Sequence, residues 1–249
     1  MGHISVAFFA IILDRIFGDY RFVKHPLVVI SELISSFEED YFKDSVFRGF
    51  LLVSFVIGVV SVFAFAISFY LAQFNVIVDG FFSSIIASFF IAHKTLYESL
   101  NENLLSNDTK TYRTSIENYA EKLNLNFIAP LFYLLIFGLP GMILYKTITT
   151  MKTMLTDEKY KKYGSVAAQL DSYVNYIPSR LSALTIMIIA RKKELFPLIS
   201  NPIKAMELAL NIKDKQTLFE NDLKAALSFR NKIEITLLIL LGSIFLIFR

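Results

Sequence analysis

The sequence contains no cysteine, so disulfide bridges, thiolate metal sites and cysteine nucleophiles are excluded. The glycine patterns GxxxxGKS/T, GxGxxG and GxSxG are also absent, which removes the usual phosphate loop, dinucleotide-binding fold and serine hydrolase. Three histidines occur, and none has a second histidine at HxxxH or HExxH spacing. A histidine metal site is therefore not expected, and any nucleotide site is expected to be unconventional.

The chain also lacks a strong excess of charge of one sign. It has 25 Lys and Arg residues and 22 Asp and Glu residues, which leaves a net charge of +3. The basic residues are spread through polar segments, and they form no basic face with interleaved aromatic residues. We therefore expect no nucleic-acid partner.

Apolar residues are abundant, since 55% of the residues are hydrophobic and 15% are aromatic. This is more apolar surface than a soluble core of this length needs to bury, so membrane lipid is the expected solvent for the excess. Residues 49–72 form an uncharged run, with Arg48 directly before it, that is longer than the roughly 20 residues needed to span a bilayer. This run is predicted to be a transmembrane helix.

Four further apolar runs extend the membrane region, at residues 80–92, 123–145, 181–190 and 235–248. The run 123–145 contains Pro130, Gly138 and Pro140, which break a membrane helix unless protein or water satisfies the freed backbone. A kinked or re-entrant element is expected there. The predicted fold class is all-α, a multi-pass integral membrane protein with four or five membrane helices.

Three polar segments connect these runs, at residues 93–124, 146–179 and 191–232, and each is long enough for one or two amphipathic helices. All three contain Lys and Arg, whereas the turn at residues 73–79 contains neither. Because basic loops mark the cytoplasmic side, the large loops are predicted to be cytoplasmic and the turn external. No repeat or linker is visible, so residues 1–249 are expected to form a single membrane domain.

Pairs of polar residues at helical spacing mark candidate sites in the polar segments. Glu117 and Glu121 are four residues apart, so their carboxylates share one helix face and could hold a divalent cation; the same spacing is also typical of a solvated face. Asp171 and Asn175 repeat the spacing. Arg180, beside an apolar run, either snorkels to the interface or binds a phosphate or carboxylate.

Three segments carry motifs in a characteristic order: LDRIFGDYRFVKHPLVVISELI at residues 13–34, IENYAEKLNLNFIAPLFYLLIFGLPGMILYKTI at 116–148 and KYKKYGSVAAQLDSYVNYIPSRLSAL at 159–184. Together they resemble the CobD/CbiB family, over roughly residues 10–190. The matching polar residues are Asp14, Asp19, His25, Glu117, Glu121, Tyr145, Lys146, Asp171, Asn175 and Arg180.

The resemblance implies an enzyme of cobalamin biosynthesis in the cytoplasmic (inner) membrane of a prokaryote. It implies that ATP and Mg²⁺ drive amide formation between adenosylcobyric acid and an aminoalcohol or its phosphate, giving adenosylcobinamide or its phosphate. The partners expected are these corrinoid and aminoalcohol-phosphate substrates, and membrane lipid.

The same resemblance assigns roles to the matching residues. The catalytic residues it implies are Glu117, Glu121, Asp171, Asn175 and Arg180, with Mg²⁺ held by Glu117, Glu121 and Asp171. The substrate-binding residues it implies are His25, Asp14, Asp19, Lys146 and Tyr145. Lys146 and Arg180 would face phosphate or carboxylate, while His25 and Asn175 would orient substrate.

Other positions depart from the family's motifs. The family's asparagine after the second glutamate is Lys122 here, and its Asn-Thr-x-Asp-Ser-Met motif reads Thr-Thr-Met-Lys-Thr-Met at residues 149–154. Lys152 then replaces an aspartate and would repel a cation. These departures keep a second interpretation open, a non-catalytic CobD/CbiB- or AmpE-like membrane paralogue with a sensing or regulatory role.

Overall fold

The computed structural model of the protein describes residues 2–18, 25–91, 109–191, 201–212 and 220–247. Within these residues the chain is helical and contains no strand, which confirms the all-α class. The helices in chain order are α1 (His3–Phe17), α2 (Pro26–Tyr41), α3 (Val46–Leu71), α4 (Val76–Phe90), α6 (Thr109–Leu123), α7 (Ala129–Met154), α8 (Ser165–Ala190), α9 (Pro202–Ala209) and α10 (Glu220–Ile247). A π-helical turn, η1 (Asn124–Ile128), joins α6 to α7, and a 3₁₀ turn, η2 (Glu158–Tyr160), precedes α8.

The chain divides into two compact units, each assembled from three separate segments. Unit 1 comprises Met1–Leu13, Tyr20–Ile91 and Pro130–Tyr176, and unit 2 comprises Asp14–Asp19, Ala92–Ala129 and Ile177–Arg249. The boundaries fall inside α1, α7 and α8 rather than in linkers. The prediction that residues 1–249 form a single domain stays a prediction.

Within the described residues, two helical stretches are long and apolar enough to cross a membrane. One is α3, with 26 residues, and the other is the 43-residue stretch Tyr112–Met154, which runs through α6, η1 and α7. Only 28% of the most apolar part of α3 is buried, so most of its apolar surface is not covered by the rest of the protein. The apolar run 80–92 is mostly α4, which has 15 residues, while the runs 181–190 and 235–247 are the C-terminal parts of α8 and α10. The count of four or five membrane helices stays a prediction.

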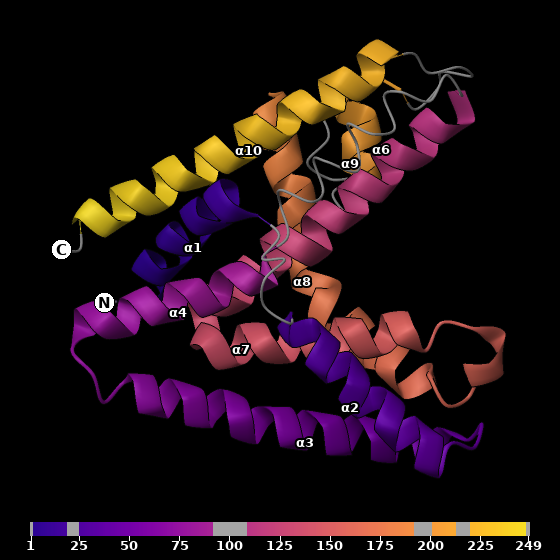
Figure 1. The fold of residues 1–249 in the computed structure, drawn as a ribbon. Coiled ribbons are helices and arrows are strands. Elements are labelled where there is room, and N and C mark those ends of the chain that lie inside the picture. Colours follow the sequence, from indigo (N-terminus) through magenta and orange to yellow (C-terminus); the bar gives the residue numbers. More distant parts are fainter. Residues whose placement is uncertain (1, 19–24, 92–108, 192–200, 213–219, 248–249) are drawn as a thin grey trace. The chain divides into compact units, whose positions relative to one another are not determined.

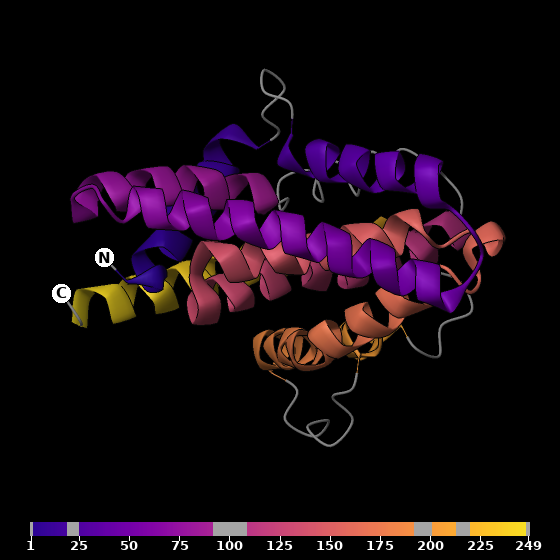
Figure 2. The same ribbon diagram turned by 90° about the horizontal axis from the view of Figure 1, so that it is seen from below.

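The helices α3 and α4 form the hairpin that residues 49–92 predict, and α2 packs against both of them (Figures 1 and 2). The connecting turn is short because Asn75 caps α4, its side chain accepting a hydrogen bond from the Val78 N–H at 2.9 Å. Ile30 and Ile34 of α2 are buried, whereas Val28 and Val29 on its other face are exposed. Since α4 has 15 residues and α3 has 26, α4 runs along only the C-terminal part of α3.

The break predicted within residues 123–145 is a reversal of the chain at Gly138. Gly138 is the one non-helical residue inside α7, with φ 68° and ψ −162°, and Pro140 follows it. The rings of Tyr133 and Tyr145, on either side of the break, stack with centroids 5.0 Å apart and planes at 13°. In an unbroken helix these two residues would be separated by about 18 Å along the axis. The structure thus shows a re-entrant helical hairpin with halves 129–137 and 139–154.

We predict that Gly138→Ala will lower the melting temperature of the purified protein. The backbone angles of Gly138 are ones that residues with a Cβ rarely adopt, and an added Cβ would also lie 3.0 Å from Nε2 of His3. The expected loss of stability is about 1–3 kcal/mol. The control is Gly58→Ala in α3, where an added Cβ meets nothing within 4 Å. Equal melting temperatures for the two variants would refute this account of the turn.

Candidate functional site

A chain of hydrogen-bonded side chains joins α7 to α8 in unit 1. The Tyr145 hydroxyl donates to Oδ1 of Asn175 at 2.9 Å, and Nδ2 of Asn175 donates to Oδ1 of Asp171 at 2.9 Å. Tyr145 is fully buried, whereas Asn175 and Asp171 are half-buried. Three residues that the sequence analysis identified in two segments therefore form one network. Its carboxylate, on Asp171, is more accessible to solvent than the Tyr145 hydroxyl at its other end.

The re-entrant hairpin is what places Tyr145 in this network. Tyr133, on the first half of the hairpin, stacks on Tyr145 and donates its hydroxyl hydrogen to the Val174 carbonyl at 2.9 Å. That bond ties the first half to α8 one residue before Asn175. The Tyr145 side chain is thereby held between the first half of α7 and α8.

The start of α8 is fixed by a contact between two loops. The Asp44 carboxylate, in the α2–α3 loop, accepts hydrogen bonds from the backbone N–H groups of Lys162 at 2.8 Å and Tyr163 at 2.9 Å. Gly49 of α3 lies so close to the Tyr163 carbonyl that a Cβ there would clash with it. The residues that precede α8 are therefore anchored to the start of α3, which sets the position of Asp171 and Asn175 further along α8.

Aromatic and charged side chains complete this loop contact. The Tyr160 hydroxyl donates to Glu38 of α2, and Lys159 forms an ion pair with the same carboxylate at 3.5 Å. Burial raises the pKa of Tyr160, and its bond to Glu38 raises it further. Burial, helped by the negative charge of Glu38, raises the pKa of Tyr163 to about 12. The sequence did not predict the contacts of Lys159 and Tyr160 with Glu38.

Lys146 follows Tyr145 on the second half of α7 and is only 4% exposed. Its backbone carbonyl accepts hydrogen bonds from the hydroxyls of Thr149 at 3.0 Å and Thr150 at 2.7 Å, and Thr153 bonds the Thr149 carbonyl at 2.8 Å. The threonines of residues 149–154 are thus turned onto the backbone of their own helix. The assignment of Lys146 to a phosphate or carboxylate stays a prediction.

Glu117 and Glu121 lie one turn apart on α6 in unit 2, as their spacing predicts. Glu117 is half-buried and Glu121 is exposed. The buried face of α6 is formed by Tyr112, Ser115, Ile116, Tyr119, Ala120 and Leu123. The two carboxylates therefore lie at the edge of an amphipathic helix, where they can reach solvent.

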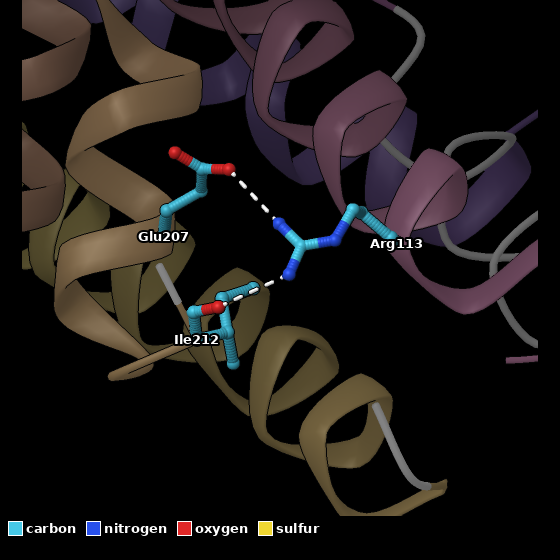
Figure 3. A network of polar contacts seen from close by, with 3 residues as sticks. All are labelled: Arg113, Glu207 and Ile212. Carbon is cyan, nitrogen blue, oxygen red and sulfur yellow. Dashed lines mark hydrogen bonds and ion pairs between the residues drawn. The ribbon is translucent and has the colours of Figure 1, made fainter. Parts of the chain in front are cut away.

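Arg113, one turn before Glu117, ties α6 to α9 (Figure 3). Its guanidinium donates to the Glu207 carboxylate at 3.3 Å and to the Ile212 carbonyl at 3.2 Å. The fork geometry of arginine allows both bonds at once. Sequence reasoning missed this pair, although Arg113 and Glu117 have the same four-residue spacing as Glu117 and Glu121.

An ion pair with one buried partner lies next to Asp14 in unit 2. The Arg15 guanidinium donates to the Glu234 carboxylate at 3.0 Å, and Glu234 itself is 1% exposed. Asp14 is 3% exposed. A carboxylate as buried as that of Glu234 requires a charged partner, which Arg15 supplies. Glu234 was not predicted, and its only signal is an acidic residue directly before the apolar run 235–248.

His25 has a capping contact at the start of α2. Its Nδ1 accepts a hydrogen bond from the Leu27 N–H at 3.2 Å, with Pro26 as the first residue of the helix, and its ring meets Phe89 edge-on. This contact accounts for the His-Pro dipeptide without a ligand. The prediction that His25 orients substrate stays a prediction, and Asp19 lies outside the described residues.

The predicted magnesium ligands divide between the two units. Asp171 belongs to unit 1, while Glu117, Glu121, Arg180 and Asp14 belong to unit 2. In the part of the chain that the structure describes, no group of three His, Asp or Glu side chains is placed to hold a metal ion. Because Mg²⁺ is usually held by one or two carboxylates together with substrate phosphates, the shared site stays a prediction.

Comparisons with known proteins agree on one family. A model of the CobD/Cbib protein family matches residues 7–110 and 106–218, a range that includes every predicted site residue from Asp14 to Arg180. A probable cobalamin biosynthesis protein CobD of Pyrococcus furiosus is 30% identical over 208 residues, which cover 74% of this chain and 72% of that relative. No solved structure matches the chain.

Two further relatives show the same level of similarity. A probable cobalamin biosynthesis protein CobD of Methanococcus maripaludis is 34% identical over 215 residues, covering 71% of this chain and 69% of the relative. A cobalamin biosynthesis protein CobD of Dehalococcoides mccartyi is 32% identical over 213 residues, covering 72% and 68%. The similarity therefore extends over more than two thirds of each protein.

We predict that Tyr163→Phe will change the alkaline stability of the protein. The folded pKa of Tyr163, about 12, lies above the ordinary value of 10.0, so the unfolded chain loses its proton first. The stability that the neutral Tyr163 contributes is therefore present below pH 10 and is lost as the pH rises toward 12. Between pH 10 and pH 12 the melting temperature of the variant should therefore fall less steeply than that of the wild type.

The same variant should be at least as stable as the wild type at pH 7. The Tyr163 hydroxyl is buried and has no hydrogen-bond partner among the described residues, so its removal relieves a desolvation penalty. The matched control is Tyr173→Phe on α8, whose side chain is 78% exposed. An alkaline profile of Tyr163→Phe identical to that of the wild type would contradict the assignment.

Proposed function

Because this chain belongs to the CobD/CbiB family of cobalamin biosynthesis, we propose that it joins adenosylcobyric acid to an aminoalcohol or its phosphate through an amide bond, with ATP and Mg²⁺. The observation that carries the proposal is the network of Tyr145, Asn175 and Asp171. All three match the family's motifs, and the network presents a carboxylate on a helix that is anchored at its start.

Amide formation of this kind requires an activated carboxylate, a positioned amine and neutralisation of phosphate charge, with little covalent work from the protein. Bound Mg²⁺ supplies the neutralisation. On this proposal Asp171 would hold the ion through its carboxylate oxygens, the type of ligand that Mg²⁺ prefers. Glu117 and Glu121, at the solvent edge of α6, would offer ligands of the same type.

The hydrogen bonds of the network fix the orientation of the Asn175 side-chain amide. Because the Tyr145 hydroxyl donates to Oδ1 of Asn175, the NH₂ group of Asn175 faces Asp171 and donates to it. Asn175 therefore holds Asp171 in one orientation while Asp171 remains an acceptor. In this role Asp171 binds the cation or an N–H of the substrate, and Tyr145 and Asn175 position it.

The second candidate is a membrane paralogue without catalysis. The observation in its favour is the segment 149–154, where Thr149, Thr150 and Thr153 bond their own helix and Lys152 replaces the family's aspartate. A hydroxyl hydrogen used in this way is not available to donate to a phosphate oxygen. On this alternative the same scaffold has a sensing or regulatory role.

The basic residues of unit 1 support an orientation of the chain in the membrane. The loop with Lys159, Lys161 and Lys162 contacts the start of α3, and the basic-free turn at residues 72–75 follows its end. A helix of the length of α3, 26 residues, rises by about 39 Å. We place the loop on the cytoplasmic side of the inner membrane, where ATP is present, and the turn on the outer side.

We predict that the purified, detergent-solubilised protein forms cobinamide phosphate from adenosylcobyric acid, aminopropanol phosphate, ATP and Mg²⁺, as detected by mass spectrometry. Asp171→Asn should lower the rate by about 100-fold or more, because it removes a charge that faces the reacting groups. Omission of Mg²⁺ should abolish the reaction. Asp157→Asn, a change at an exposed carboxylate in the α7–α8 loop, is the control and should retain full activity.

Two results would count against this assignment. Absence of product with every aminoalcohol tested, from protein with a cooperative unfolding transition, would favour the paralogue. Full activity of Asp171→Asn would leave ligation in place and remove the network from its mechanism.

The topology has its own test, because the absence of cysteine gives labelling experiments no background. In intact cells, a membrane-impermeant maleimide should label Gln73→Cys, in the α3–α4 turn. It should label Lys161→Cys, an exposed position in the α7–α8 loop, only after the cells are permeabilised. The reverse pattern would invert the proposed orientation.

A further inference from the structure

A cavity of about 350 Å³ lies at the tip of the α7 hairpin in unit 1, lined by residues of α1, α3, α4 and α7. Its walls are mostly apolar and include the rings of Phe65 and Phe137. Four polar side chains line it as well: His3, Ser68, Asp79 and Ser83. A volume of roughly 300–1,000 Å³ and a few polar groups in an apolar wall are typical of small-molecule sites.

Asp79 gives this cavity a negative charge. It is the only charged residue of α4, and it accepts a hydrogen bond from the buried Ser83 hydroxyl at 3.0 Å. The residues that line the cavity include no lysine or arginine. An ionisable side chain in an apolar membrane hairpin usually marks a functional site.

The break at Gly138 adds backbone acceptors to the same cavity. The first half of α7 ends there, and the last carbonyls of a helix have no partner within it. One of them, the Leu135 carbonyl, is hydrogen-bonded to Nδ1 of His3 at 3.1 Å. The cavity is lined on both sides of the break, by Leu134, Phe137, Leu139 and Pro140. Unwound backbone at membrane depth occurs where it is buried in protein or lines a cavity.

Ser68 of α3 provides a further polar group. Its Oγ atom is buried and has no hydrogen-bond partner among the described residues, although the residue lines the cavity. A buried hydroxyl without a partner is destabilising unless a bound molecule or water satisfies it. The hydroxyl oxygen can accept a hydrogen bond from a donor within the cavity.

We propose that this cavity binds a small organic ammonium ion, whose charged group lies at Asp79 and Ser83 and whose alkyl part lies against Phe65 and Phe137. A carboxylate, hydroxyl oxygens and aromatic faces are the groups that stabilise an ammonium ion in an apolar site. A bare divalent cation would require about six oxygen ligands in close geometry, which an apolar wall with one carboxylate does not offer. The chemistry therefore selects an organic cation.

The test compares three probes by isothermal titration calorimetry on the full-length protein in a non-ionic detergent at pH 7. The probes are propylammonium, 1-propanol and sodium ions. Propylammonium and 1-propanol have the same shape, but 1-propanol carries no charge. Propylammonium should bind, and 1-propanol should bind about tenfold more weakly or worse, because it forms no charge-assisted hydrogen bond with Asp79. Equal affinity for both probes, or binding of sodium in competition with propylammonium at the same concentration, would overturn the proposal.

Variants then locate the bound ion. Asp79→Asn keeps the shape of the side chain and removes its charge, so propylammonium should bind about tenfold more weakly or worse. The matched control, Asp40→Asn at an exposed position of α2 that does not line the cavity, should leave the affinity unchanged. Unchanged affinity of Asp79→Asn would refute the site. If Asp79→Asn fails to fold, Ser83→Ala takes its place, because it removes the hydroxyl that bonds Asp79, and unchanged propylammonium affinity of that variant would refute the site.

This binding experiment requires neither ATP nor a corrinoid. Its failure would therefore leave the proposed ligation untouched, and failure of the ligation would leave the ammonium site untouched.

Discussion

The hydrogen bonding of the α7 backbone at Gly138 is the constraint on which the arrangement of unit 1 depends. In a bilayer, a broken helix is tolerated only where protein or water satisfies the freed N–H and C=O groups. Here His3 bonds one carbonyl of the first half, and residues of α1, α3 and α4 line one pocket together with the tip. The reversal brings Tyr133 onto Tyr145, and Tyr145 then meets Asn175 and Asp171. The candidate site and the cavity at the tip are thus two consequences of one turn.

Unit 2 contains ion pairs that join separate segments of the chain. Arg15 pairs with the buried carboxylate of Glu234 in α10, and Arg113 joins α6 to α9 through Glu207. Loss of Arg15 would leave the Glu234 charge buried without this partner, which is unfavourable. The contact of Arg113 with Glu207 helps to fix the rotation of α6. For α6 that rotation places Glu117 and Glu121 at its solvent edge.

Family membership and local structure constrain the function in different ways. The matched range covers the predicted polar residues, and the network of Tyr145, Asn175 and Asp171 shows that some of them act together. Residues 149–154 show the opposite case, because the hydroxyls of Thr149, Thr150 and Thr153 bond the backbone of their own helix. A residue that is similar in type to the family's can therefore have a purely local role. His25, which caps α2, is a second example of a local contact.

The sequence by itself determined the helical class, the long apolar helix α3, the hairpin with α4 and the existence of a break near Gly138 and Pro140. These are local properties, since they follow from hydropathy over about 20 residues and from the backbone geometry of glycine and proline. It also determined that Glu117 and Glu121, and Asp171 and Asn175, share helix faces, because that depends only on a spacing of four.

Only the tertiary structure decided that the break reverses the chain, that Tyr145 reaches Asn175, and that Glu234 pairs with Arg15 across more than 200 positions of sequence. The physical reason is that each of these contacts joins residues far apart in the chain, and the local sequence around either residue does not indicate its partner. Asp44 and the loop before α8 form such a pair, as do Asp79 and the rest of its cavity. Hydropathy predicts which surfaces are buried, and packing of whole helices selects which polar groups meet within them.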